Sequence, residues 1–125
     1  MTEVSAGIIR DRLGRVLICR RKEGSNAHLW EFPGGKREPG EDAAACLIRE
    51  CREELGVELE TGDVLARYVQ AGPERVLSFT FLNARIVWGK PVLRVHEAME
   101  WVFPADLKYY PFCEADAAIL GRLTD

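Results

Sequence analysis

Three glutamates near the middle of the chain are spaced so that together they could bind a metal ion. Glu50 precedes Glu53 and Glu54 by three and four positions, which places the three side chains on one face of an α-helix. Like charges at that spacing repel by roughly 0.2–0.5 kcal/mol per pair, and a divalent cation removes the repulsion. Hard cations such as Mg²⁺ prefer oxygen ligands. The spacing therefore indicates a carboxylate site for a divalent metal ion.

The same glutamates also have a simpler interpretation. Glu-rich helix faces are usually only solvated, and Arg49 and Arg52 could pair with these carboxylates. Taken alone, the helix favours this interpretation. The residues before and after the glutamates change the balance because they complete a longer pattern at fixed spacing.

That pattern begins in a glycine-rich loop and ends just after the helix. Gly35 is followed after five residues by Glu41, and after seven more by Arg49-Glu50-Cys51-Arg52-Glu53-Glu54-Leu55-Gly56-Val57. The arrangement resembles the Nudix box, with Cys51 as a small apolar residue at the one position that departs from the usual choice. The preceding run LWEFPGGK, residues 29–36, resembles the MutT-type branch of that family.

The resemblance implies hydrolysis of a nucleoside diphosphate linked to another group, with Mg²⁺ or Mn²⁺ required. It assigns Glu50 and Glu54 as the main metal ligands, Glu53 as a ligand directly or through water, and the Gly34 carbonyl as a further ligand. Arg49 would orient a carboxylate through a charge-assisted hydrogen bond.

A general base must also be supplied, and the sequence leaves two sources open. One is a carboxylate of the helix, Glu50 or Glu53. The other is a glutamate of the segment before Trp101, where Glu97 is our choice and Glu100 the reserve. We expect His96, in the same segment, to be exposed or structural.

Substrate binding is expected from residues on both sides of the box. Arg21 and Lys36 could bind phosphate, with Arg21 supported by the MutT-type resemblance. Phe32 could stack on a nucleobase. Asp116 lies where MutT-type enzymes carry a base-reading Asn or Asp, and a carboxylate would accept from an exocyclic amine. The alternatives are a solvated arginine at a strand end and a helix first-turn aspartate favoured by the dipole.

The elements that must position these residues follow from periodicity and turn signals. We predict strands at 4–9 and 15–21 that pair as a hairpin, and an extended piece at 30–32. The helix spans 43–55, with Ala44, Ile48, Cys51 and Leu55 on its apolar face and Gly56 ending it. After a polar connection at 58–62, strands follow at 64–70, 75–88 and 101–103, and a terminal helix at 114–123. This order predicts an α/β (α+β) fold, and the resemblance specifies an α/β/α sandwich with a mixed β-sheet and a catalytic loop-helix-loop.

Length and composition agree with one Nudix domain over residues 1–125. The chain has 47% hydrophobic and 30% charged residues, as ordinary globular proteins do. A net charge of −3 argues against an extended nucleic-acid partner. The four cysteines lack metal spacing, so we expect buried, reduced thiols. No membrane span or secretory signal is apparent, and we expect a cytoplasmic monomer or homodimer.

The sequence therefore predicts metal-dependent hydrolysis of an NTP or dNTP to NMP and pyrophosphate, serving to sanitise the nucleotide pool. Oxidised, methylated and cytidine-type nucleotides are candidate substrates. Two alternatives stay open: an ADP-ribose or nucleotide-sugar pyrophosphatase, and a non-catalytic Nudix domain that binds nucleotide.

Overall fold

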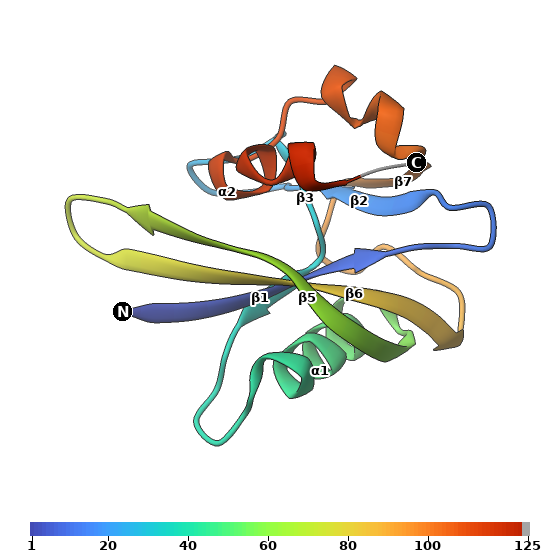
Figure 1. Ribbon diagram of the computed structural model, residues 1–125, viewed down its shortest axis with the longest axis horizontal. Coiled ribbons are helices and arrows are strands. Elements are labelled where there is room, and N and C mark those ends of the chain that lie inside the picture. The colour runs from blue at the N-terminus through green and yellow to red at the C-terminus, as the bar shows by residue number, and fades with distance from the viewer. Residues whose placement is uncertain (124–125) are drawn as a thin grey trace.

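Two β-sheets and one long helix make up most of the molecule. The computed structural model describes residues 1–123, and Figure 1 shows the arrangement. In chain order, its elements are β1 (Thr2–Ile9), β2 (Val16–Arg20), β3 (Trp30–Glu31), β4 (Gly34–Lys36), α1 (Ala43–Leu55), β5 (Glu58–Ala71), β6 (Val76–Trp88), β7 (Ala98–Val102), the 3₁₀ helix η1 (Pro104–Tyr109), α2 (Glu114–Ala118) and the 3₁₀ helix η2 (Leu120–Arg122).

The larger sheet is mixed and lies between helical layers. Its order is β4-β1-β6-β5, with β1 parallel to β6 and the other pairs antiparallel. Helix α1 lies below this sheet in Figure 1, and α2 lies above it with the smaller β3-β2-β7 sheet. The predicted α/β/α sandwich with a mixed sheet is confirmed.

The predicted hairpin between the first two strands is wrong. A turn at Asp11 to Gly14 does reverse the chain, and Arg10 forms one bridge with Val16. Both edges of β1 are already occupied, however, by β4 and β6. Strand β2 therefore belongs to the smaller sheet, where it pairs with β3 and β7.

Helix α1 begins and ends where the sequence predicts. The Asp42 side chain accepts a hydrogen bond from the Ala45 N–H at the N-terminus, and Gly56 ends the helix in the left-handed conformation with φ 71°. The predicted apolar face is only partly right. Cys51 and Leu55 are buried as expected, but Cys46 and Leu47 are the other fully buried residues, in place of Ala44 and Ile48.

Three boundaries differ from the prediction. The stretch 58–62 is not a connection but the start of β5, which absorbs its polar residues through register shifts between Thr61 and Ala66. Strand β7 begins at Ala98, earlier than predicted. The terminal helix is short, because α2 gives way after Ala118 to the tighter η2.

Two hydrophobic cores flank the larger sheet. One packs β1, β2 and β6 against η1, α2 and η2, and includes Ile8, Phe81 and Leu107. The other packs α1 against β5 and β6, and includes Leu47, Leu55 and Leu82. All four cysteines are buried and free, as expected. None of the helices within residues 1–123 has the length and apolar character needed to cross a membrane.

Candidate active site

Helix α1 presents Glu50 and Glu54 toward strand β4, one turn apart. The approach depends on glycine: a Cβ added to Gly35 would lie 2.4 Å from Cδ of Glu50. On the other side of β4, a Cβ on Gly34 would lie 1.9 Å from the carbonyl oxygen of Ser5. The two glycines thus let β4 fit between β1 and the carboxylates of α1.

Arg49 joins the loop before α1 to the carboxylates on it. Its Nε donates to Oε2 of Glu41 at 2.6 Å, and its Nη2 to the Lys36 carbonyl at 3.1 Å. Its Nη1 donates to Glu50 at 3.1 Å and to Glu53 at 3.2 Å. The hydrogen bond from Arg49 holds the pKa of Glu41 below its ordinary value. Arg49 therefore contacts the carboxylates that the sequence expected it to orient.

The three glutamates of α1 are not equivalent. Burial, followed by the negative charge of Glu50, raises the pKa of Glu54 to about 7. Oε1 of Glu54 is buried without a hydrogen-bond partner in the described chain. The Glu53 side chain is instead 56% exposed and pairs with Arg49. The predicted convergence is thus closest for Glu50 and Glu54.

Across residues 1–123, no group of three or more His, Cys, Asp or Glu side chains is arranged to hold a metal ion. The donor chemistry nevertheless fits one. Two neighbouring carboxylates repel each other without a counter-ion, and the unpartnered oxygen of Glu54 is a polar atom whose burial is costly unless it is bonded. A divalent cation is the partner that would satisfy both.

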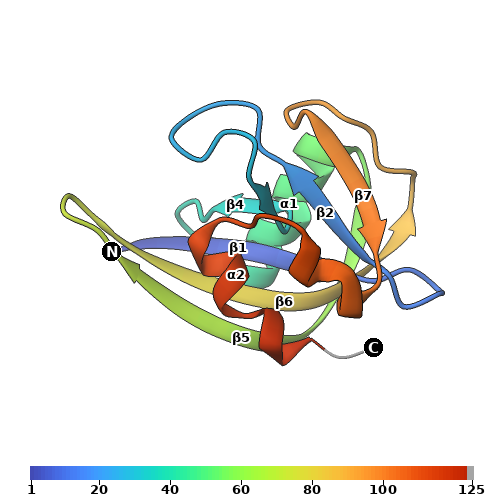
Figure 2. The same ribbon diagram turned by 90° about the horizontal axis from the view of Figure 1, so that it is seen from above.

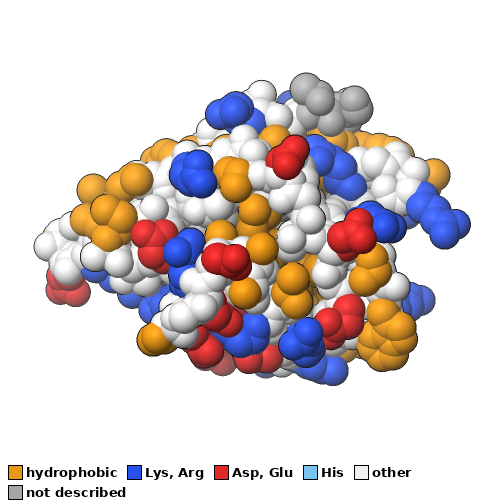
Figure 3. Space-filling model, turned by 60° about the horizontal axis from the view of Figure 1, so that its bottom comes forward, with side chains coloured by type: hydrophobic (Ala, Val, Ile, Leu, Met, Phe, Trp, Pro, Cys, Tyr) orange, Lys and Arg blue, Asp and Glu red, His pale blue; other side chains and the backbone are white. Residues whose placement is uncertain are grey.

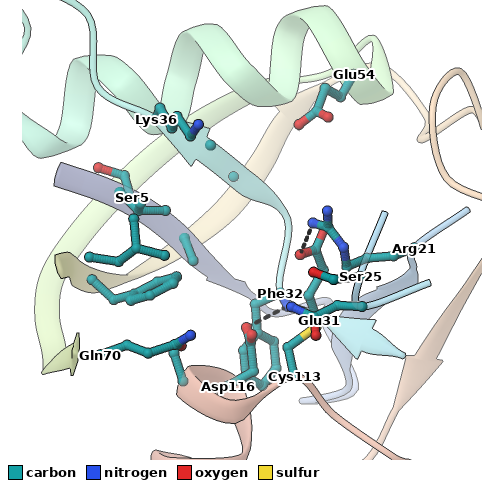
Figure 4. A pocket seen from close by; sticks show the side chains of 18 of the residues that line it. Ser5, Arg21, Ser25, Glu31, Phe32, Lys36, Glu54, Gln70, Cys113 and Asp116 are labelled. Carbon is teal, nitrogen blue, oxygen red and sulfur yellow. Dashed lines mark hydrogen bonds and ion pairs between the residues drawn. The ribbon is translucent and has the colours of Figure 1, made fainter. Parts of the chain in front are cut away.

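A cavity of about 320 Å³ reaches Glu54 and is lined in part by Arg21, Glu31, Phe32, Lys36, Glu54 and Asp116. Figure 4 shows Glu54 and Lys36 at one end, and Asp116 at the other. Between them, Nη1 of Arg21 donates to Glu31 at 3.0 Å. Four predicted substrate-binding residues, Arg21, Phe32, Lys36 and Asp116, therefore line one cavity.

Asp116 is almost fully buried at the end of this cavity farthest from α1. Its Oδ1 accepts a hydrogen bond from the Phe32 N–H at 2.9 Å, so the two predicted substrate-binding residues are in direct contact. Burial raises the pKa of Asp116 to about 8. The carboxyl is thus protonated at neutral pH, and could donate as well as accept hydrogen bonds.

None of the four candidate bases, Glu50, Glu53, Glu97 and Glu100, lines this cavity. Glu97 pairs with Arg20 at 2.6 Å and with His28 at 2.7 Å, and the hydrogen bond with His28 is the main reason its pKa is lowered. Glu100 accepts from the Tyr110 hydroxyl. These contacts make Glu97 a weaker base than an unpaired carboxylate, and its role as the general base stays a prediction.

The family model described as "NUDIX domain" matches residues 1–123. This chain belongs to the Nudix family. The match covers both sheets, α1 and the cavity, and members of the family generally depend on divalent metal ions.

Named relatives cover nearly the whole chain. It is 36% identical to a CTP pyrophosphohydrolase of Escherichia coli over 96% of this chain and 89% of the relative. It is 34% identical to an 8-oxo-dGTP diphosphatase of Haemophilus influenzae over 97% of this chain and 90% of the relative. Among solved structures, a MutT NUDIX hydrolase from Burkholderia pseudomallei superposes with a TM-score of 0.87 and 28% identity, covering 98% of both chains.

Several cavity residues of this Nudix protein were not predicted. Gln70 comes from β5, Arg75 from the connection between β5 and β6, and Ser25 from the loop after β2. No local pattern marks them, because they meet the cavity only when distant strands pair. Glu31 was different: it stands inside the LWEFPGGK run and could have been singled out there.

Proposed function

We propose that the protein is a nucleoside triphosphate pyrophosphohydrolase that uses Mg²⁺, with Mn²⁺ as a substitute. The observation that carries the proposal is the cavity itself, which joins buried hydrogen-bonding groups at Phe32 and Asp116 to the Glu54 carboxylate of the Nudix helix. Curated relatives named CTP pyrophosphohydrolase and 8-oxo-dGTP diphosphatase support the same substrate class.

The end of the cavity at Asp116 would receive the nucleobase. Phe32 and Phe79 supply apolar surface there, and the carboxyl of Asp116 supplies a polar edge. Because Oδ1 already accepts from the Phe32 N–H, the other oxygen is the one available to a base. A protonated Asp116 carboxyl would donate a hydrogen bond to an acceptor on the nucleobase. The group that it contacts on the nucleobase therefore need not be the exocyclic amine expected from the sequence.

The end at α1 would receive the phosphates. Glu50, Glu54 and the Gly34 carbonyl would hold Mg²⁺, with Glu53 acting through water. The bound ion would lower the pKa of a water molecule and shield phosphate charge. Arg49 keeps the carboxylates oriented through its bonds to Glu41 and Glu50.

The reaction would proceed by attack of water on the β-phosphorus. The water oxygen bonds to the β-phosphorus while the bond between the β-phosphorus and the α–β bridging oxygen breaks. The bridging oxygen leaves with the NMP, and the β- and γ-phosphates leave as pyrophosphate. Glu53, exposed and held only by Arg49, would take the proton from water. Arg21 and Lys36 would balance negative charge on the phosphates.

A substrate panel tests this proposal. Pyrophosphate release would be measured with Mg²⁺ for ordinary, oxidised and methylated NTPs and dNTPs, beside ADP-ribose and nucleotide sugars. We expect release from one or more triphosphates, and its loss in Glu54→Gln. Turnover of ADP-ribose alone would replace the substrate class. A thermal shift with a nucleotide but no turnover of any compound would indicate a binding protein.

A further inference from the structure

A second cavity of about 390 Å³ adjoins the first. It is lined by Arg21, Lys22, Glu23, Glu31, Glu54, Arg94, Val95 and His96. Arg21, Glu31 and Glu54 line both cavities, so the second begins at the shared wall where the first ends. Its other residues come from the loop after β2 and the loop before β7, which rise on the same side of the molecule in Figure 2.

The two cavities differ in chemistry. The first contains apolar and aromatic side chains, among them Phe32, Leu77 and Phe79. The second has one apolar side chain, Val95, and every other lining residue is ionisable. A planar nucleobase would find stacking surface in the first, whereas the second suits a small, highly charged and hydrated group.

Of the lysine and arginine side chains that line the second cavity, Arg21 is paired with a carboxylate, whereas Lys22 and Arg94 are available to a ligand. Glu31 uses both oxygens internally, one with Arg21 at 3.0 Å and the other with the buried Nε2 of His96 at 2.9 Å. Within residues 1–123, neither Lys22 nor Arg94 forms an ion pair.

Arg94 is nevertheless held in place. Its Nη1 donates to the carbonyls of Arg52 and Glu53, at 3.2 and 3.1 Å, near the end of α1. Arg21 keeps a buried Nε without a protein partner in the described part of the chain. When a metal ion neutralises the charge of Glu54, the cavity contains three cationic side chains, those of Arg21, Lys22 and Arg94. Only two carboxylates, Glu23 and Glu31, oppose them, so the cavity has a net positive charge and attracts anions.

We infer that this second cavity is the subsite for the terminal phosphates of the substrate, and that Lys22 and Arg94 bind the pyrophosphate before it leaves. The inference rests on the proposed function, since it places the NMP portion in the first cavity and the phosphorus under attack beside Glu54. Lys22 and Arg94 thereby select triphosphates over shorter phosphate chains.

Isothermal titration of the full chain with pyrophosphate, in the presence of Mg²⁺, tests the subsite directly. We expect Lys22→Gln to weaken pyrophosphate binding by about 3-fold and Arg94→Gln by about 10-fold, because each removes a charge-assisted contact. Binding of the NMP should change less than about 2-fold in both variants. Arg12→Gln and Lys108→Gln, exposed cations outside both cavities, are matched controls and should bind pyrophosphate as the wild type does.

Two results would overturn the inference. One is wild-type affinity for pyrophosphate in both variants while Glu54→Gln loses it, which would place pyrophosphate on the metal ion alone. The other is an equal loss of pyrophosphate and NMP affinity. Because Arg94 also contacts α1, the thermal stability of each variant is measured beside its titration. Lys22 lies on an exposed loop, so Lys22→Gln is not expected to disturb the fold. Failure of the substrate panel would refute the proposed function separately, since the titration requires no turnover.

Discussion

Replacing Asp116 with asparagine should make the protein increasingly more stable than the wild type as the pH rises from 5 to 7. The carboxyl is 5% exposed, and burial raises its pKa from 3.8 to about 8. Asparagine keeps an oxygen that can accept from the Phe32 N–H but has no proton to lose in this range. The comparison therefore isolates the ionisation of one buried group.

The direction follows from proton binding in the two states. Between pH 3.8 and about 8 the folded chain keeps the Asp116 proton, while the unfolded chain releases it. Rising pH then favours the unfolded state by about 1.4 kcal/mol per unit, a cost absent below this window and complete above it. From pH 5 to pH 7 the advantage of Asp116→Asn should grow by on the order of 3 kcal/mol, or about 10 °C in Tm for a chain of this length.

Urea and thermal unfolding at pH 5, 6 and 7, without nucleotide or metal, measure the effect. Asp106→Asn makes the same substitution on an exposed turn of η1 and is the matched control for replacing a buried aspartate. Parallel stability curves for wild type and Asp116→Asn would refute the reasoning. They would show that Arg21 or water keeps the carboxyl ionised in the fold, despite the opposing charge of Glu31.

Three further predictions concern the carboxylate site. Glu54→Gln should lower kcat/KM by at least about 10²-fold through lost metal affinity, checked by Mg²⁺ titration of activity, whereas retention within a few-fold would exclude Glu54 as a ligand. Glu41→Gln removes the strongest partner of Arg49 and should weaken Mg²⁺ binding by about 10-fold, with circular dichroism unchanged; full affinity would show that the loop is positioned in another way. Gly35→Ala should impair activity because its methyl group would lie 2.4 Å from the Glu50 carboxylate. Gly121→Ala is the control, because its methyl group meets nothing within 4 Å. Kinetics and Tm are measured for both variants, and equal activities would contradict the close approach of Gly35 to Glu50.

The parts of this protein that were predictable are those fixed by local sequence. Helix α1 runs between a capping Asp42 and a left-handed Gly56, both recognisable from neighbouring residues. The Nudix box lies almost wholly within that helix and the loop before it, so its spacing survives folding. An orienting contact from Arg49 to a carboxylate of the helix was also expected, and Arg49 contacts Glu50, whereas its contact with Glu41 was not predicted.

The parts that were not predictable depend on pairing between distant segments. The turn after β1 does reverse the chain, yet β1 has no free edge for β2 because β4 and β6 occupy its two sides. Which glutamate of α1 becomes buried is set by β4 and by the loops around it, not by helical spacing. The surroundings of Glu97 were hidden for a similar reason: its partners Arg20 and His28 are remote in sequence and close only in the fold.

The position of the first strand has a consequence for how the protein is made. Thr2 to Ile9 pair in parallel with Leu77 to Ala84, so β1 waits for a partner that leaves the ribosome only after α1 and β5. Until then an apolar strand with one unpaired edge is exposed, and such intermediates aggregate readily. Folding should be slow and should depend on chaperones. Destabilising substitutions in β6 should reduce the soluble yield more than substitutions at equally buried positions in α1.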